Sequence, residues 1–302
     1  MHGSRRGTRG LRRGDTVGVV ATGFAVEPQR LAAGVARLGR LGFRVALGRH
    51  VLDRHGYLAG TDDARAADLT EMLGAADVQA VWFARGGYGT ARILDRVPWR
   101  ALARAPKLLI GYSDLTALFA PAIDRARTLC LYGPVVAELG EVAAWHAPSL
   151  RGLLSGRPVE LRIAARNVLV GGRARGRLVG GNLTVLAHLC GTRYEPDCRD
   201  AILFFEDAGE PTYRIDRMLT QLGQAGWLTR VRGVVVGSLD TPPRRRFPPD
   251  RALDDVLGEA LVPLGVPVVR GLVAGHVAHK RTLPLGGLCE LDTRAGVLRL
   301  RP

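Results

Sequence analysis

The segment LLIGYSDLTALF, residues 108–119, places a lone serine between a strand-like apolar run and a helix-like run. A serine at such a turn, after Gly111, has the arrangement of a nucleophile elbow. The turn lifts the hydroxyl off the sheet, and the next helix directs free N–H groups at the same spot. Ser113 is therefore a candidate nucleophile. The simpler alternative is that Ser113 or Asp114 only caps the helix, and Leu115 breaks the full GxSxG pattern.

A nucleophilic serine needs a base within reach. His276, in GLVAGHVAHKRTLPLG, follows the strand-like run VPVVRGL and stands beside Gly275 in a turn, from which a ring can project into a cleft. The alternative is an idle loop histidine, which is common. His188 lies in the apolar helix-like run LTVLAHLCG, which favours a place in the core. His276 is thus the candidate base.

The imidazole in turn needs an acid that fixes its tautomer and stabilises its charge. The segment AILFFEDAGEP offers Glu206, Asp207 and Glu210 directly after a buried strand-like run. Acids at a strand end are often part of a site, although solvated loop acids are the alternative. The chain order would then be serine, acid, histidine, as in many α/β hydrolases.

A glycine-rich turn, ARGGYGTARILD at residues 84–95, ends another strand-like run. It is expected at the same carboxyl edge of a parallel sheet, where ligands bind in open α/β folds. Gly86, Gly87 and Gly89 would let the backbone approach a substrate closely. The segment is neither a GxGxxG nor a Walker sequence, and a plain tight turn is the alternative.

These segments sit in a regular alternation of strand-like and helix-like runs up to about residue 135, which predicts a parallel sheet covered by helices. The run DDARAADLTEMLG, for example, predicts a helix that begins at Asp62 or Asp63 as N-cap and ends at Gly74. Between about 140 and 175 the pattern loosens. We therefore expect a basic disordered tail over 1–14, an α/β nucleophile domain over 15–155, and a second α/β domain with some antiparallel sheet over 165–302.

The composition excludes several classes of protein. Of 43 basic residues only Lys107 and Lys280 are lysine, so the other 41 are arginine, spread along the chain. The formal charge of +15 thus reflects compositional bias, and we expect no nucleic-acid partner. No export signal and no apolar run long enough for a membrane helix is visible. The four cysteines form no CxxC or ligand pattern, which favours free thiols in the cytoplasm and no metal.

Six motifs together resemble the LD-carboxypeptidase family of serine peptidases: RGGYGTARIL, IGYSDLTAL, YGPVV, GRLVGGNLTVLAHLCGT, ILFFEDAGEPTYRIDRMLTQL and GHVAHKRTLPLGG. The resemblance covers nearly the whole chain. It implies an N-terminal parallel-sheet domain of Rossmann or flavodoxin type and a C-terminal swivelling β/α domain. The implied triad at their junction is Ser113, Glu206 and His276, with Glu210 as the alternative acid. The oxyanion hole would be formed by the backbone N–H groups of Gly87 and Asp114.

The resemblance further implies an activity: cleavage of the bond between the L-centre of a diamino acid and the terminal D-alanine of a cytoplasmic murein tetrapeptide. It implies a homodimer and no cofactor. By position, Arg85 is a candidate to grip the terminal carboxylate and Tyr112 a candidate to contact substrate. The chain departs from many relatives at Ala21, Thr22 and Gly23, where a different pocket floor is expected. It also departs at Tyr132, where a change of substrate preference is expected.

Two other functions remain open from sequence. One branch of the family, the microcin C self-immunity peptidases, uses the same triad on aminoacyl nucleotides, and Trp145 would be the aromatic platform for the base. The second alternative is a catalytically silent module whose two lobes close on a cell-wall peptide or nucleotide.

Overall fold

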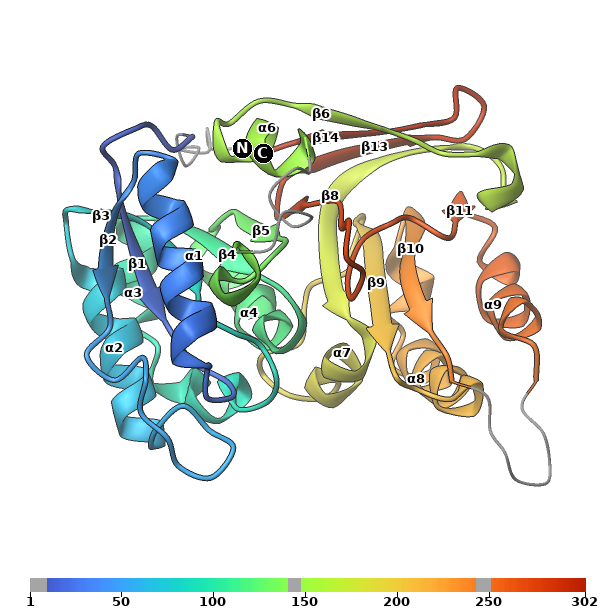
Figure 1. Cartoon of the computed structure of the whole chain (residues 1–302). Helices are drawn as coiled ribbons and strands as arrows, with labels where there is room; N and C mark the ends of the chain where they lie inside the picture. Colours follow the sequence, from blue (N-terminus) through green and yellow to red (C-terminus); the bar gives the residue numbers. More distant parts are fainter. Residues whose placement is uncertain (1–9, 141–147, 243–250) are drawn as a thin grey trace.

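Two lobes, each built around a β-sheet, make up the computed structural model, which describes residues 10–140, 148–242 and 251–302 (Figure 1). The first sheet has the order β12-β5-β4-β3-β1-β2. Its five N-terminal strands are parallel, and β12, from near the end of the chain, pairs antiparallel with β5. The strands are β1 Thr16–Val20, β2 Arg44–Leu47, β3 Val78–Phe83, β4 Leu108–Gly111, β5 Cys130–Tyr132 and β12 Leu283–Leu285.

The order of the five parallel strands, 2-1-3-4-5, is that of flavodoxin-like sheets. The central strands are buried on both faces, as is typical of parallel sheets, and β3 is apolar except for Gln79. Helices pack on both sides of the sheet, and short 3₁₀ turns join them. The elements of this lobe are α1 Pro28–Arg40, α2 Asp62–Gly74, α3 Trp99–Arg104, α4 Thr116–Ala126, α6 Pro148–Leu154, η1 Thr90–Arg96, η2 Ser113–Leu115 and η3 Val136–Glu138.

Local signals at two element ends differ from expectation. Helix α2 begins one residue earlier than its acidic pair suggests, because Thr61 is the N-cap and its hydroxyl accepts the N–H of Ala64. Asp62 and Asp63 occupy the first turn, where they complement the helix dipole. Residues 1–9 of the predicted tail lie outside the described residues. Leu11 is buried, and its N–H donates to the carbonyl of Leu154.

The second sheet has eight strands in the order β6-β14-β13-β8-β9-β10-β11-β7. Strands β8 to β11 are parallel, and antiparallel strands flank them on both sides. In Figure 1, β6, β13 and β14 run across the top, and α7 and α8 lie below β8 to β10. The elements are β6 Val159–Arg162, β7 Val168–Val170, β8 Arg173–Asn182, β9 Ile202–Ala208, β10 Gly233–Asp240, β11 Val268–Val269, β13 Leu288–Asp292, β14 Val297–Arg301, α7 Leu183–Leu189, α8 Thr212–Gln224, α9 Leu253–Leu261, η4 Ala165–Asn167, η5 Leu228–Arg230 and η6 Val262–Leu264.

Several contacts join the lobes. The side chain of Tyr132 at the end of β5 packs edge-on against Phe204 of β9, with ring centroids 5.4 Å apart. The hydroxyl of Thr116, at the start of α4, accepts the N–H of Asn182 at the end of β8 (2.9 Å). Strand β12 carries the chain back from the second lobe into the first sheet. The carboxyl ends of β4, β5 and β9 are thereby brought together.

Helix α1 lies so close to the 135–138 segment that one of its glycines has no room for a side chain. A Cβ on Gly34 would overlap the carbonyl oxygen of Val136, whereas a Cβ on Gly39 of the same helix would meet nothing within 4 Å. We predict that Gly34→Ala lowers the free energy of unfolding by about 1–3 kcal/mol through overpacking. Gly39→Ala should instead raise it by about 0.5–1 kcal/mol, because alanine favours the helix. Urea denaturation measures both. Equal effects of the two substitutions would contradict the close approach.

Candidate active site

Ser113 sits at a sharply turned position directly after β4. Its φ of 66° is in the left-handed region, which is uncommon for a residue other than glycine and typical of strained functional turns. Its side chain does not cap α4, whose N-cap is Leu115 with no side-chain hydrogen bond. Instead the Oγ of Ser113 lies 3.1 Å from Nε2 of His276. The hydroxyl is thus presented to the second lobe.

His276 lies on the loop between β11 and β12 and is held at two points by Glu206. Its backbone N–H donates to Oε2 of Glu206 (3.0 Å), and its Nδ1 is 2.8 Å from the same oxygen. Because an ionised carboxylate only accepts, Nδ1 carries the proton and Nε2 is free to accept from Ser113. The preceding Gly275 has φ of 103°, and a Cβ there would overlap the Glu206 carboxylate. Only glycine fits this approach.

The pKa of His276 is raised above its ordinary value. Burial of the ring works against protonation, but the hydrogen bond and charge of Glu206 outweigh it, with a contribution from Asp207. The nearby charge of Lys280 opposes the rise. The ring is therefore a stronger base than a free imidazole.

Glu206 is fully buried on β9 and is surrounded by donors. Its Oε1 accepts the hydroxyl of Tyr132 at 2.7 Å and lies 3.4 Å from Nδ2 of Asn182. The neighbouring Asp207 faces the start of α7, where it accepts the backbone N–H and the hydroxyl of Thr184, both at 2.8 Å. Burial raises the pKa of Asp207, and these donors counter the rise. Asp207 thereby fixes the strand end that carries Glu206.

The structure separates the candidates that the sequence left open. Ser113, Glu206 and His276 meet in one hydrogen-bonded chain. Glu210 lies outside it and forms an ion pair with Arg214 on α8 (3.0 Å). His188 is part of α7, but the expectation of a core position is wrong, since its side chain is exposed.

The glycine turn after β3 packs against the serine. A Cβ on Gly86 would lie 3.2 Å from Cβ of Ser113, and Gly87 has φ of 103°. Asp114 holds this turn from the other side, because its buried carboxylate accepts the N–H of Thr90 (2.9 Å). Burial raises the pKa of Asp114, while the hydrogen bonds from Thr90 work against the rise. Gly87 thus lines the same cleft as Ser113, and Asp114 follows the serine in the chain and fixes the turn that contains Gly87.

A cleft of about 320 Å³ opens in front of Ser113 and His276. It lies where the loops after β1 and β3 diverge, which is the topological switch point of a flavodoxin-like sheet. The charged groups on its walls are Glu27, Arg30, Arg85 and Glu138. Sequence reasoning selected only Arg85 among them. Its guanidinium donates to the carbonyl of Ala25 (3.0 Å) and remains exposed.

One wall of the cleft is a compact cluster around Tyr112. Its hydroxyl donates to Oε1 of Glu138, and Nζ of Lys280 reaches the same oxygen, both at 2.8 Å. Lys280 is buried, with Nζ 4.1 Å from the centroid of the Tyr112 ring, and His276 lies against the ring at 4.9 Å. Burial and the charge of Glu138 raise the pKa of Tyr112. Sequence reasoning missed Lys280, although it is one of only two lysines in the chain.

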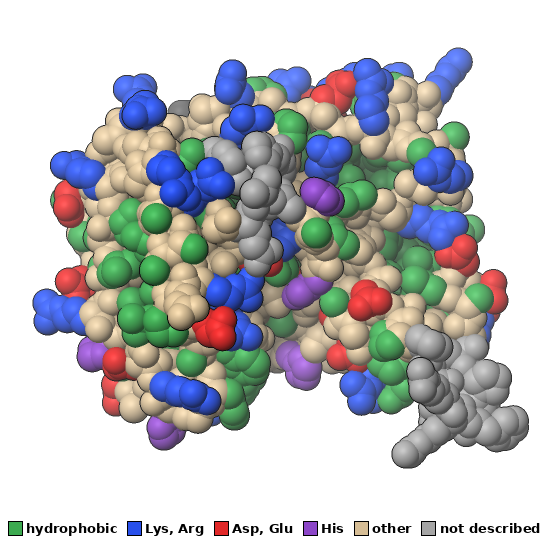
Figure 2. All heavy atoms as spheres, viewed as in Figure 1, with side chains coloured by type: hydrophobic (Ala, Val, Ile, Leu, Met, Phe, Trp, Pro, Cys, Tyr) green, Lys and Arg blue, Asp and Glu red, His purple; other side chains and the backbone are tan. Residues whose placement is uncertain are grey.

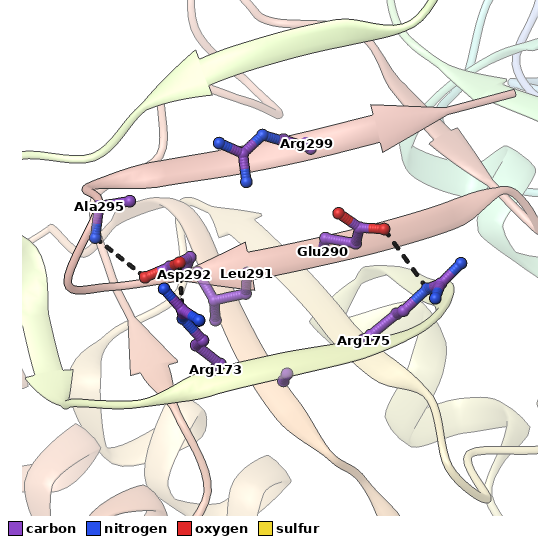
Figure 3. A pocket seen from close by; sticks show the side chains of 8 residues that line it. Arg173, Arg175, Glu290, Leu291, Asp292, Ala295 and Arg299 are labelled. Atoms are coloured by element: carbon purple, nitrogen blue, oxygen red, sulfur yellow. Dashed lines mark hydrogen bonds and ion pairs between the residues drawn. The ribbon is translucent and has the colours of Figure 1, made fainter.

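A larger hollow, about 610 Å³, lies on the outer face of β8 and β13 (Figure 3). Its charges are paired across the strands: Arg173 with Asp292 at 2.7 Å and Arg175 with Glu290 at 3.4 Å. Basic side chains are likewise spread over both lobes among acidic ones (Figure 2). The smaller cleft therefore holds the candidate site, whereas the charged side chains around the larger hollow pair with one another.

Within the described ranges, no group of three or more His, Cys, Asp or Glu side chains could hold a metal ion. In the same part of the chain, no helix has the length and apolarity needed to cross a membrane. The four cysteines are free thiols.

Comparison with known proteins agrees with this architecture. Residues 17–133 match the LD-carboxypeptidase N-terminal domain, and residues 175–291 match the LD-carboxypeptidase C-terminal domain. The murein tetrapeptide carboxypeptidase of Pseudomonas aeruginosa is 34% identical over 91% of this chain and 92% of its own. The microcin C7 self-immunity protein MccF of Escherichia coli is 26% identical over 92% and 91%.

A solved structure, the muramoyltetrapeptide carboxypeptidase from Oxalobacter formigenes, superimposes with a TM-score of 0.85 at 30% identity and covers 94% of this chain and 97% of its own. The predicted two-domain α/β fold is confirmed. With both family domains present in order and a shared fold over nearly its full length, the chain belongs to the LD-carboxypeptidase family of peptidases.

Proposed function

We propose that this protein is a serine carboxypeptidase that removes the terminal D-alanine of murein tetrapeptides by cleaving its bond to the L-centre of a diamino acid. The observation that carries the proposal is the chain of hydrogen bonds from Glu206 through His276 to Ser113 at the wall of a cleft. The similarity to a murein tetrapeptide carboxypeptidase supports the choice of substrate. We place the reaction in the cytoplasm, in cell-wall recycling, and propose a homodimer.

In the proposed reaction, Nε2 of His276 takes the proton of the Ser113 hydroxyl as Oγ attacks the scissile carbonyl carbon. The imidazolium is stabilised by Glu206, to which Nδ1–H is already bonded. His276 then gives the proton to the leaving nitrogen, so that D-alanine departs and the acyl group stays on Ser113. Water, deprotonated by the same ring, attacks the ester and releases the tripeptide.

The negative oxygen of the tetrahedral intermediate needs donors on the far side of Ser113. We propose the backbone N–H groups of Gly87, which lines the same cleft as Ser113, and of Asp114, the next residue in the chain. The Asp114 carboxylate contributes indirectly, because its bond to Thr90 fixes the loop that contains Gly87. Such preorganised donors lower a barrier by several kcal/mol in total, about 3–4 for each donor.

The leaving residue of the substrate ends in a carboxylate, which needs a cation in the cleft. Arg30 and Arg85 are the guanidinium groups on its walls, and we propose that they bind this carboxylate. Tyr112 contacts substrate through its ring, since its hydroxyl is taken by Glu138.

An aminoacyl nucleotide is the second candidate substrate, because MccF shares the family. Trp145, the expected stacking residue, lies outside the described residues. The higher identity to the murein enzyme favours the peptide. Mass analysis of products from a murein tetrapeptide and from an aminoacyl sulfamoyl nucleotide separates the two substrates.

Loss of the nucleophile should abolish turnover without abolishing binding. We predict that Ser113→Ala lowers kcat for D-alanine release by about 10⁴- to 10⁶-fold, as in other triads, while affinity for the tetrapeptide is retained. Ser155→Ala, on an exposed turn, is the matched control and should be fully active. A wild-type protein that binds the peptide but releases no D-alanine would support the silent-module alternative instead.

The reaction needs neutral His276, so activity is lost as the pH falls through the raised pKa of this ring. We predict an acid limb of kcat/KM with its midpoint above about 6.5, the ordinary value for histidine. Glu206→Gln removes the charge that raises this pKa, so the limb should move to lower pH and kcat should fall about 10²- to 10⁴-fold. Glu210→Gln should leave the acid limb and kcat unchanged. If Glu210→Gln shifts the limb instead, the triad acid is Glu210 and not Glu206.

The proposed carboxylate site can be tested by changing the arginines of the protein and, separately, the terminal carboxylate of the peptide. We predict that Arg30→Gln and Arg85→Gln each raise KM for the tetrapeptide about 10- to 100-fold, the range expected for a charge-assisted hydrogen bond. With a tetrapeptide that ends in D-alaninamide, wild type should already bind weakly, and the substitutions should add little. Arg100→Gln, on α3 outside the cleft, is the control. If the substitutions weaken acid and amide substrates equally, the two arginines do not bind the carboxylate.

A further inference from the structure

Tyr132 is a buried phenol that the mechanism above does not use. It ends β5, is 1% exposed, and pairs with Gly111 of β4, two residues before the serine. Its ring packs edge-on against Tyr112 and Phe204, at centroid distances of 6.1 and 5.4 Å. Because these rings come from different lobes, packing fixes the Tyr132 ring beneath the elbow at the lobe junction.

The hydroxyl of Tyr132 makes two hydrogen bonds at once. It donates to Oε1 of Glu206 (2.7 Å) and accepts the backbone N–H of Ser113 (3.1 Å). A phenol has one proton to donate and lone pairs to accept with, so the two bonds are compatible. A single oxygen atom therefore touches the nucleophile's backbone in one lobe and the acid in the other.

Each bond has a distinct consequence. The N–H of Ser113 belongs to a backbone at φ 66°, and its bond to a fixed oxygen restrains this unfavourable turn. The carboxylate of Glu206 is divided in function: Oε2 serves His276, while Oε1 serves Tyr132 and, at a longer distance, Asn182. A strong donor on Oε1 draws electron density from Oε2, which weakens the stabilisation of an imidazolium.

We propose that Tyr132 is a positioning residue for the proposed reaction: its hydroxyl keeps Ser113 and Glu206 in register across the lobe junction and moderates the pull of Glu206 on His276. The inference rests on the proposed serine mechanism. It also replaces the sequence expectation that Tyr132 changes substrate preference, since Tyr132 is not among the residues that line the cleft. Its hydroxyl faces the triad instead.

The titration of His276 can report this role. The charged and titratable groups around the ring are Glu206 and Asp207 from β9, Lys280 from its own loop, and Tyr112 from the elbow. Glu138 faces it only through its bonds to Lys280 and Tyr112. A change confined to the hydroxyl of Tyr132 leaves all of these groups in place. A movement of the acid limb therefore reports the bond between Tyr132 and Glu206.

The test uses two substitutions with opposite electronic effects. Tyr132→Phe removes the donor, so kcat/KM should fall about 10- to 100-fold, mainly in kcat, and the acid limb should move to higher pH. Tyr132→3-fluorotyrosine, made by site-specific incorporation, keeps the ring and both bonds but is a stronger donor. Its acid limb should move to lower pH. Tyr194→Phe, which loses a hydroxyl bonded to Asp95, is the control and should match wild type.

The rate of Ser113 modification by a fluorophosphonate, followed against pH, supplies a readout that needs no peptide substrate. If wild type reacts with the reagent but cleaves no murein tetrapeptide, the proposed substrate is wrong, and the role of Tyr132 is still decided by the labelling rates. An acid limb at the same pH in wild type and both variants overturns the inference, even if Tyr132→Phe is slow. Should Tyr132→Phe fail to fold, the direction of the 3-fluorotyrosine shift decides alone.

Discussion

The hydrogen bond between Nε2 of His276 and Oγ of Ser113 crosses from one lobe to the other. Its length of 3.1 Å depends on how the two lobes pack together. A serine and a base on separate sheets are useful only if the sheets keep a fixed relation to each other. The junction is accordingly rich in short polar contacts. Lys280 pairs with Glu138, Asn182 bonds to Thr116, and strand β12 is hydrogen-bonded into the first sheet.

At the centre of this junction is a carboxylate with no access to water. Isolated in a protein interior, an ionised group would cost several kcal/mol in lost hydration. Glu206 is compensated by donors from both lobes, namely the hydroxyl of Tyr132 and the ring and backbone of His276. These hydrogen bonds to Glu206 form only when the two lobes are correctly aligned. A misaligned arrangement would leave the buried carboxylate without some of its donors. The same group that holds the ring of His276 thus penalises incorrect docking of the lobes.

The sequence predicted those features that follow from local rules. The apolar run before Gly111 predicted that Ser113 lies at the turn after a strand, and the alternation of strand-like and helix-like runs predicted the parallel sheet. What it missed depends partly on which of several adjacent residues caps a helix and partly on contacts between residues far apart in the sequence. Thr61, and not one of its acidic neighbours, is the N-cap of α2. The side chain of His188 faces solvent because only part of the apolar run in α7 is buried. Arg30 reaches the cleft through the packing of α1, and Lys280 reaches the Tyr112 ring through the return of the chain to β12, which no local spacing encodes.

The loop with the candidate base is anchored at its two ends on different sheets, since β11 belongs to the second and β12 to the first. Any twisting of one lobe against the other would therefore strain this connection, as it would the two-residue link from β12 to β13. Under gentle heating or mild denaturant, hydrolysis would cease while circular dichroism and the buried tryptophans still report an intact protein. The protein would thus lose its activity before it loses its secondary structure or the packing within each lobe.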